Sequence, residues 1–113
     1  MAKVEIVESL FDAIEKKFKD EVHEIIDLLE TLEENPKKGK AIGQVGGIVI
    51  KELKYKKFRF YFITDGYKVK FLDIKDLHNL LIKFVRMSDK KSQQKTIDEI
   101  KYVLEKFGDE GFD

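Results

Sequence analysis

The spacing of the apolar residues changes part-way along the chain, and this change constrains the fold more than any other feature of the sequence. Apolar residues recur at helical spacing in residues 10–18 and again in residues 20–32. Residues 48–54 and 58–64 are instead runs of β-branched and aromatic residues, which are typical of strands. The Asn-Pro pair at 35–36 separates the two halves, because proline disfavours helical geometry in the residue before it. The pattern predicts an α+β domain in which an antiparallel helix hairpin packs on a sheet.

Further elements are expected at both ends of the predicted domain. A short strand is expected at residues 3–7, before the first helix. Residues 80–87 have strand composition, and a last helix should begin near Ser92. That helix should end at Gly108, where a glycine can adopt the left-handed cap.

The middle of the sheet is predicted from an Asp-Gly pair at 65–66, which is the preferred composition of a two-residue hairpin turn. Residues 67–72 are therefore expected to return as a third strand, in which apolar residues alternate with lysines. The result is a small, twisted, mainly antiparallel sheet with one solvated basic face. The glycine- and lysine-rich residues 34–47 are expected to form a flexible loop.

Charge is distributed unevenly along a chain whose formal net charge is zero. Residues 1–34 hold four lysines and eleven acids, a net charge of −7. Residues 35–95 hold sixteen basic residues and five acids, a net charge of +11, and residues 96–113 return to −4. A polyanion responds to local potential, so the middle of the chain is a candidate nucleic-acid surface. At 113 residues the chain is expected to form one domain, residues 1–113, with an acidic tail at 108–113.

Several function classes are disfavoured by what the chain lacks. It has no cysteine, which excludes disulfides and thiol catalysis and points to a reducing, cytoplasmic location. His23 and His78 lack ligand spacing and are expected at the surface, so neither a metal nor a cofactor is predicted. No apolar stretch is long enough to suggest a membrane span or a membrane partner.

Two stretches carry a pattern shared with a known family. Residues 47–54 read GIVIKELK and residues 58–62 read FRFYF, which together resemble an "E-L-R … Y-R-I-x-Y" core. Residues 83–88 resemble an "F-V-K-K-S" segment that precedes a closing helix. This ordered set, which covers about residues 6–104, resembles the RelE/ParE toxin superfamily and in particular its phage-derived, HigB-like branch. The resemblance implies a RelE-like fold.

The same resemblance implies the toxin of a type II toxin–antitoxin system, a metal-independent, ribosome-dependent mRNA endonuclease that inhibits translation. The RNA's own 2′-hydroxyl would attack the neighbouring phosphate while basic side chains stabilise the charge that develops. By resemblance, Arg59 is the central phosphate clamp and Arg86 a second clamp near the leaving group. Lys51 and Lys54 would contact the backbone or transfer protons, and Glu52 could act as the general base.

A wider set of basic and aromatic residues is expected to bind RNA: Lys37, Lys38, Lys40, Tyr55, Lys56, Lys57, Tyr61, Lys83, Lys90 and Lys91. Each of these residues could instead have a purely structural role. A lysine on a strand can simply be solvated, and the aromatic run at 58–62 can be core rather than a base-stacking platform. Arg59 can form a structural salt bridge to Glu52. Strand alternation also cannot place Lys51 and Lys54 on one face without a bulge.

Two functions from different classes are therefore carried forward. The first is the toxin-like ribonuclease, whose partners would be the ribosome, its mRNA and an antitoxin protein. The second is a non-catalytic module on the same fold that binds RNA or a protein, which the lack of a tyrosine or histidine just after Arg86 favours. Inhibition of DNA gyrase, as in the ParE branch, has no supporting motif. The acidic residues 98–113 are expected to cover the basic sheet in place of a partner.

Overall fold

The computed structural model describes residues 1–113, and the chain has an α+β fold built on a five-stranded mixed sheet. In chain order the helices and strands are β1 (Lys3–Ile6), α1 (Glu8–Phe18), α2 (Val22–Glu30), β2 (Lys40–Val45), β3 (Ile48–Tyr55), β4 (Phe58–Asp65), α3 (Gly66–Phe71), β5 (Leu81–Asp89) and α4 (Gln93–Phe107). Short 3₁₀ turns lie at Lys19–Glu21, Thr31–Glu33, Ile74–Asp76 and Asp109–Gly111.

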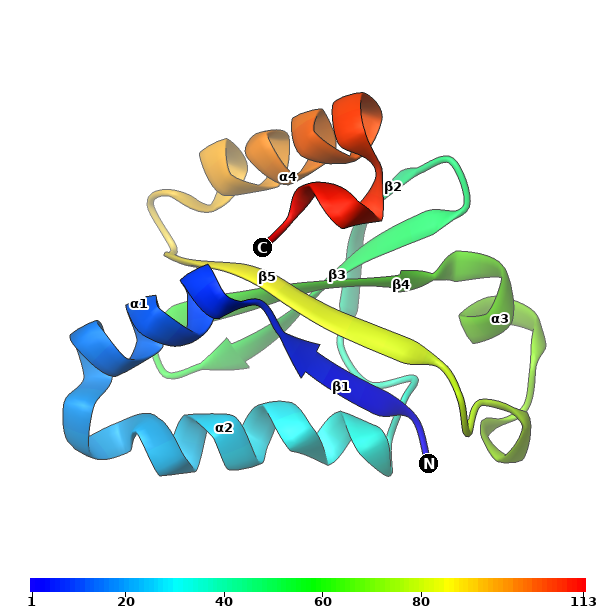
Figure 1. Ribbon diagram of the computed structural model, residues 1–113, viewed down its shortest axis with the longest axis horizontal. Helices are drawn as coiled ribbons and strands as arrows, with labels where there is room; N and C mark the ends of the chain where they lie inside the picture. Colours follow the sequence, from blue (N-terminus) through cyan, green and yellow to red (C-terminus); the bar gives the residue numbers. More distant parts are fainter.

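The strands are ordered β1-β5-β4-β3-β2 across the sheet. Strands β2, β3, β4 and β5 pair antiparallel, and only β1 runs parallel to its neighbour β5. This confirms the prediction of a mainly antiparallel sheet with a short first strand. Figure 1 shows α1 and α2 below the sheet in that view and α4 above it. No helix combines the length and the apolar character that a membrane span requires.

Alternation along β4 decides which side chains each helix layer covers. Phe58 and Phe60 point toward α1, because the ring of Phe18 lies 5.0 and 6.2 Å from their rings. Arg59 and Tyr61 must therefore point to the opposite face. That is the face under α4, because Glu52, the partner of Tyr61 across β3, accepts a hydrogen bond from Gln93 of α4.

The predicted helices are confirmed. In α1 the buried residues are Leu10, Ile14 and Phe18, one helical face, although Phe11, which the pattern places with them, remains 36% exposed. The second helix begins with a 3₁₀ turn, and the last one ends at Gly108, whose φ of +71° suits a residue without a Cβ.

The prediction of a flexible loop at residues 34–47 is wrong from Lys40 onward, where the chain forms strand β2. β2 pairs with β3 from Lys40 opposite Glu52 to Val45 opposite Ile48, so the glycines at 46–47 form the hairpin turn. The strand was hidden because it lies at the sheet edge, is interrupted by Gly43 and has few β-branched residues.

The third strand expected at residues 67–72 is also wrong, because this segment is the helix α3. The Asp65 carboxylate accepts the backbone N–H of Lys68 at 3.0 Å, which is a helix N-cap and not a hairpin turn. Tyr67 and Phe71 share a spacing that fits both a strand face and one turn of helix, and their ring centroids lie 4.9 Å apart on α3. The strand that pairs with β4 after this point in the chain is β5, and residues 67–72 are not part of the sheet.

A third prediction, that one face of the sheet is basic and exposed to solvent, is also wrong. Helix α4 covers the centre of the second sheet face with the buried side chains of Ile97, Ile100 and Leu104. The acidic tail folds back after Gly108 and buries Phe112, which is 4% exposed. Its last residue is held by Ser9, whose backbone N–H and hydroxyl both donate to the Asp113 carbonyl. The centre of the sheet is therefore covered on both sides.

Candidate nucleic-acid interface

A cleft of about 450 Å³ opens at one end of the sheet, where the β3–β4 turn lies beside the connection from β5 to α4. Pairing of β4 with β5 brings these two turns together, because Phe58 lies opposite Asp89 and Arg59 opposite Ser88. Five cations and one carboxylate line the cleft: Lys56, Lys57, Arg59, Asp89, Lys90 and Lys91. We call this the basic cleft.

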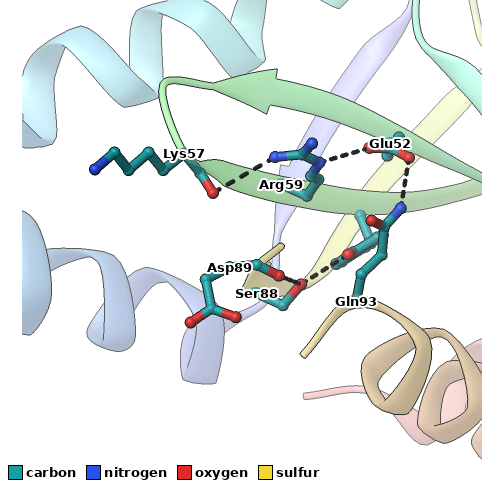
Figure 2. Close-up of polar contacts among 7 residues, drawn as sticks. Glu52, Lys57, Arg59, Ser88, Asp89 and Gln93 are labelled. Atoms are coloured by element: carbon teal, nitrogen blue, oxygen red, sulfur yellow. Dashed lines mark hydrogen bonds and ion pairs between the residues drawn. The ribbon is translucent and has the colours of Figure 1, made fainter. Parts of the chain in front are cut away.

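Arg59 is held at the edge of the basic cleft by a buried carboxylate (Figure 2). Its Nε lies 3.3 Å from Oε2 of Glu52, and the two side chains are 11% and 3% exposed. Gln93 donates from Nε2 to the other Glu52 oxygen at 3.0 Å, and Arg59 Nη1 approaches the Lys57 carbonyl at 3.5 Å. This contact is an ion pair without hydrogen-bond geometry, because neither Arg59 Nε nor Glu52 Oε2 has a hydrogen-bond partner. The salt-bridge alternative for Arg59 is therefore confirmed, and the residue still lines the basic cleft.

The lysines of the β5–α4 connection are positioned by Asp89. The Asp89 carboxylate accepts the backbone N–H of Ser92 at 2.9 Å, and this hydrogen bond holds the pKa of Asp89 below its usual value. The turn keeps Lys90 and Lys91 at the surface, and neither lysine forms an ion pair. Lys57 is likewise exposed and unpaired. These three ammonium groups are the available charges of the cleft.

Tyr61 lies beneath the cleft and cannot stack on a base, because it is fully buried. Its hydroxyl lies 2.7 Å from Ser88 Oγ, and Ser88 in turn donates to the Asp89 carbonyl (Figure 2). Ser88 uses its one proton in that bond, so Tyr61 is the donor to Ser88. Burial raises the pKa of Tyr61 above its usual value. Tyr61 is thus a neutral anchor for the turn.

Lys51 and Lys54 lie on opposite faces, as strand alternation requires. Lys54 is exposed and lies directly across from Arg59, beside the basic cleft. Lys51 is only 5% exposed on the α1 and α2 side, where its Nζ donates to the Lys37 carbonyl at 2.9 Å and lies 5.9 Å from the Phe62 ring centre. Burial lowers the pKa of Lys51. Lys51 therefore holds the 36–40 segment and does not meet Arg59.

Arg86 is also separated from the basic cleft by its contacts. Its Nε donates to Glu99 of α4 at 2.6 Å, and its Nη1 donates to the Val85 carbonyl at 2.7 Å. The guanidinium carbon lies 5.1 Å from the centre of the Phe112 ring, which covers it. Lys83 is similarly engaged, because its Nζ donates to the Asp109 carbonyl. The structure does not assemble Arg59, Arg86, Lys51 and Lys54 into one open site.

Tyr55 and Lys56 are tied to the helix hairpin through Glu21. One Glu21 oxygen accepts the Tyr55 hydroxyl at 2.6 Å and the Lys56 ammonium at 2.5 Å. Both bonds lower the pKa of Glu21, and the bond to Glu21 raises the pKa of Tyr55 to about 12. Lys56 has a φ of +53°, so the β3–β4 turn is held in a left-handed conformation. These contacts fix the wall of the cleft and leave Tyr55 buried.

Stability at alkaline pH should report this hydrogen bond. Because the folded-state pKa of Tyr55 exceeds the value of 10.0 expected when unfolded, the bond stabilises the protein fully below pH 10 and is lost as pH rises through about 12. In urea denaturation, the stability advantage of the wild type over Tyr55→Phe should be constant near neutrality and shrink between pH 10 and 12. An advantage that does not change with pH in this range would contradict the assignment.

The other basic candidates lie away from the basic cleft or at its border. Lys37 and Lys38 are exposed on the segment before β2, and Lys40 is exposed opposite Glu52 at the sheet edge. His23 and His78 are exposed, as expected. Sequence reasoning missed Gln93 and Asp89, which hold Glu52 and the lysine turn. No local pattern marks either residue, because their partners lie across the sheet.

The fold and the cleft together define a class: an α+β domain that gathers unpaired cations at one end of its sheet. Comparison with known proteins finds no matching family model, no matching curated protein and no matching solved structure.

Proposed function

We propose that the protein binds single-stranded RNA through the phosphates of the strand, which lie in the basic cleft. The observation that carries the proposal is the charge of the cleft, five cations against one carboxylate in a chain whose formal net charge is zero. Three of the cations are free lysines, which suit phosphate contacts that position a strand without reading its sequence. Arg59, pre-oriented by Glu52, supplies a planar donor group for one phosphate.

RNA cleavage is the second candidate, and it would make the protein a toxin of the RelE/ParE type. A strand, two helices, an antiparallel sheet interrupted by α3 and a closing helix follow one another in the chain, and this order supports the candidate only through the α+β class. In the reaction the 2′-hydroxyl would attack the adjacent phosphorus and the P–O5′ bond would break, which leaves a 2′,3′-cyclic phosphate and a 5′-hydroxyl. Arg59 supports the charge-stabilising role. Glu52 is buried and paired, and Arg86 is covered, so binding is better supported than catalysis.

Direct binding measurements test the first candidate. Fluorescence anisotropy with a labelled RNA of about 12 nucleotides should show an affinity that falls steeply between about 50 and 200 mM salt. An affinity that is negligible at the lower salt concentration would exclude the proposal. Incubation with translating ribosomes tests the second candidate, since cleavage would leave mRNA fragments with 2′,3′-cyclic phosphate ends.

We also expect the C-terminal segment to restrain binding, because it occupies Lys83 and Arg86. A chain lacking residues 108–113 loses both the Phe112 ring over Arg86 and the Asp109 carbonyl bound to Lys83. Its RNA affinity should rise by up to about tenfold, because Lys83 is released and one face of Arg86, which stays paired with Glu99, is uncovered.

The matched control keeps this cover and removes only its charge. Asp109→Asn, Glu110→Gln and Asp113→Asn together remove the same three carboxylate side chains while Phe112 stays in place. If the truncated and the neutralised proteins bind RNA equally, the segment acts only through its charge and the cover has no role.

A further inference from the structure

A second cavity, of about 610 Å³, lies at the opposite end of the sheet from the basic cleft. Its walls come from α3, from the end of β4, from the first residues of β3 and β5, and from the turn after α4. Figure 1 shows α3 at this end of the sheet, at the right of the view. The floor is apolar and includes Ile48, Ile63 and Leu80. This volume lies within the range of small-molecule sites, about 300–1,000 Å³.

The rim of this cavity carries aromatic surface that the fold leaves uncovered. Tyr67 lines the cavity and is 66% exposed, and its neighbour Phe71 is 61% exposed. The two rings contact each other on α3, and Lys70 lies 5.4 Å from the centre of the Phe71 ring. Exposed rings beside lysines are typical of surfaces on which unpaired bases stack.

The polar groups of the cavity fit a base better than they fit a phosphate or an apolar ligand. Lys68 and Lys83 are balanced by Asp65 and Asp109, so the cavity is not strongly cationic. Asp65 uses one oxygen to cap α3, which leaves the other to accept an N–H. Asn79 adds an amide that can both donate and accept. A neutral ring with hydrogen-bond donors and acceptors on its edge matches this set.

We propose that this cavity binds an unpaired nucleobase. Tyr67 stacks on the base, Asn79 and Asp65 bond its edge, and Lys68 contacts the attached phosphate. The inference rests on the proposed RNA-binding function, because the base is taken to belong to the strand whose phosphates occupy the basic cleft. The two sites lie at opposite ends of β4, an eight-residue strand, and strand geometry separates them by roughly 23 Å. A strand of the length that other single-strand binders hold, about 4–16 nucleotides, can reach both.

Tyrosine substitutions test the proposal against a matched control on the same protein. Tyr67→Ala should weaken binding of an RNA of about 12 nucleotides by about tenfold and leave the salt dependence unchanged, because no charge is removed. Tyr67→Phe, which keeps the ring, should restore binding. Tyr102→Ala removes a tyrosine of similar exposure, 58% on α4 and outside the cavity, and should have little effect. Thermal unfolding confirms that each variant folds.

A second measurement separates this inference from the proposed function. In NMR titrations, AMP or UMP alone should shift the backbone resonances of Tyr67, Lys68 and Asn79 and leave those of Lys90 and Lys91 in place. If Tyr67→Ala binds RNA as well as Tyr102→Ala does, the base site is refuted. The proposed function would still be upheld if variants of the cleft lysines lose binding. If RNA does not bind at all, shifts by the mononucleotides at the cavity would still support a base site, whose ligand would then be a free nucleotide. If RNA does not bind and the mononucleotides cause no shifts at the cavity, the base site is refuted.

Discussion

An Arg59→Ala protein should be about 3–5 kcal/mol less stable to unfolding than the wild type, because removal of Arg59 leaves Glu52 as a buried charge without its partner. The Glu52 side chain is 3% exposed, and its Oε2 has no hydrogen-bond donor, only the ion-pair contact with Arg59 Nε at 3.3 Å. Gln93 satisfies only the other oxygen. Urea denaturation followed by circular dichroism measures the change.

The control for this prediction removes both charges together. A Glu52→Leu and Arg59→Leu double variant should unfold near the wild-type midpoint, since replacing a buried ion pair by apolar residues is often neutral or stabilising. A loss below about 1 kcal/mol for Arg59→Ala would place the pair among exposed salt bridges and contradict its burial.

This result bears on any functional test of Arg59. A loss of RNA binding or of toxicity in Arg59→Ala can arise from unfolding alone, and the same holds for a variant that also lacks Arg86, because Arg86 anchors α4 through Glu99. Lysines that make no ion pair are better probes of the basic cleft.

Replacing Lys90 and Lys91 together by alanine should weaken RNA binding by about 10- to 100-fold at low salt, since each removes one charge-assisted phosphate contact. The slope of log affinity against log salt should become shallower by about 1.4, or about 0.7 for each lost phosphate contact on a single strand. Stability should hardly change, because both side chains are exposed and neither pairs with an acid. Anisotropy titrations across a series of salt concentrations measure both quantities.

The matched control changes net charge by the same amount elsewhere. Lys16 on α1 and Lys106 on α4 are exposed and lie outside the basic cleft. Replacing both by alanine should weaken binding only slightly, through long-range potential that salt screens. If the two double variants lose the same affinity, the protein attracts RNA by its general charge and the cleft is not the binding site.

Periodicity predicted those elements whose side chains face one environment along their whole length. The two N-terminal helices and α4 follow it, because a face that meets the core must repeat with the geometry of the backbone. Strands β3, β4 and β5 were predicted instead from their apolar composition, because neighbouring residues on them are buried on both faces of the sheet. Residues 67–71 escaped it because a spacing of four fits both a strand and one turn of helix. Asp65 caps the helix in the structure, but in the sequence the Asp65-Gly66 pair predicts a hairpin turn.

The candidate site was predicted only in part. Arg59, Lys56, Lys57, Lys90 and Lys91 were all expected to meet RNA, and the pairing of β4 with β5 brings them to one cleft. Strand alternation alone predicted that Lys51 and Lys54 lie on opposite faces of the sheet. The covering of Arg86 by Phe112 had no signal in the local pattern, because the two residues lie on different elements and meet only when the chain folds back after Gly108.

The sequence by itself determined the α+β class, the positions of most elements and the concentration of positive charge in the middle of the chain, since these depend on composition and on neighbours within a few residues. Only the tertiary structure decided which of those charges are free. Burial and pairing depend on strand register and on which helix closes each sheet face, and these join residues as distant as Glu52 and Gln93. The sequence predicted a basic sheet face, whereas the structure has a basic cleft at one end of the sheet. Arg86 and Lys51 make structural contacts instead.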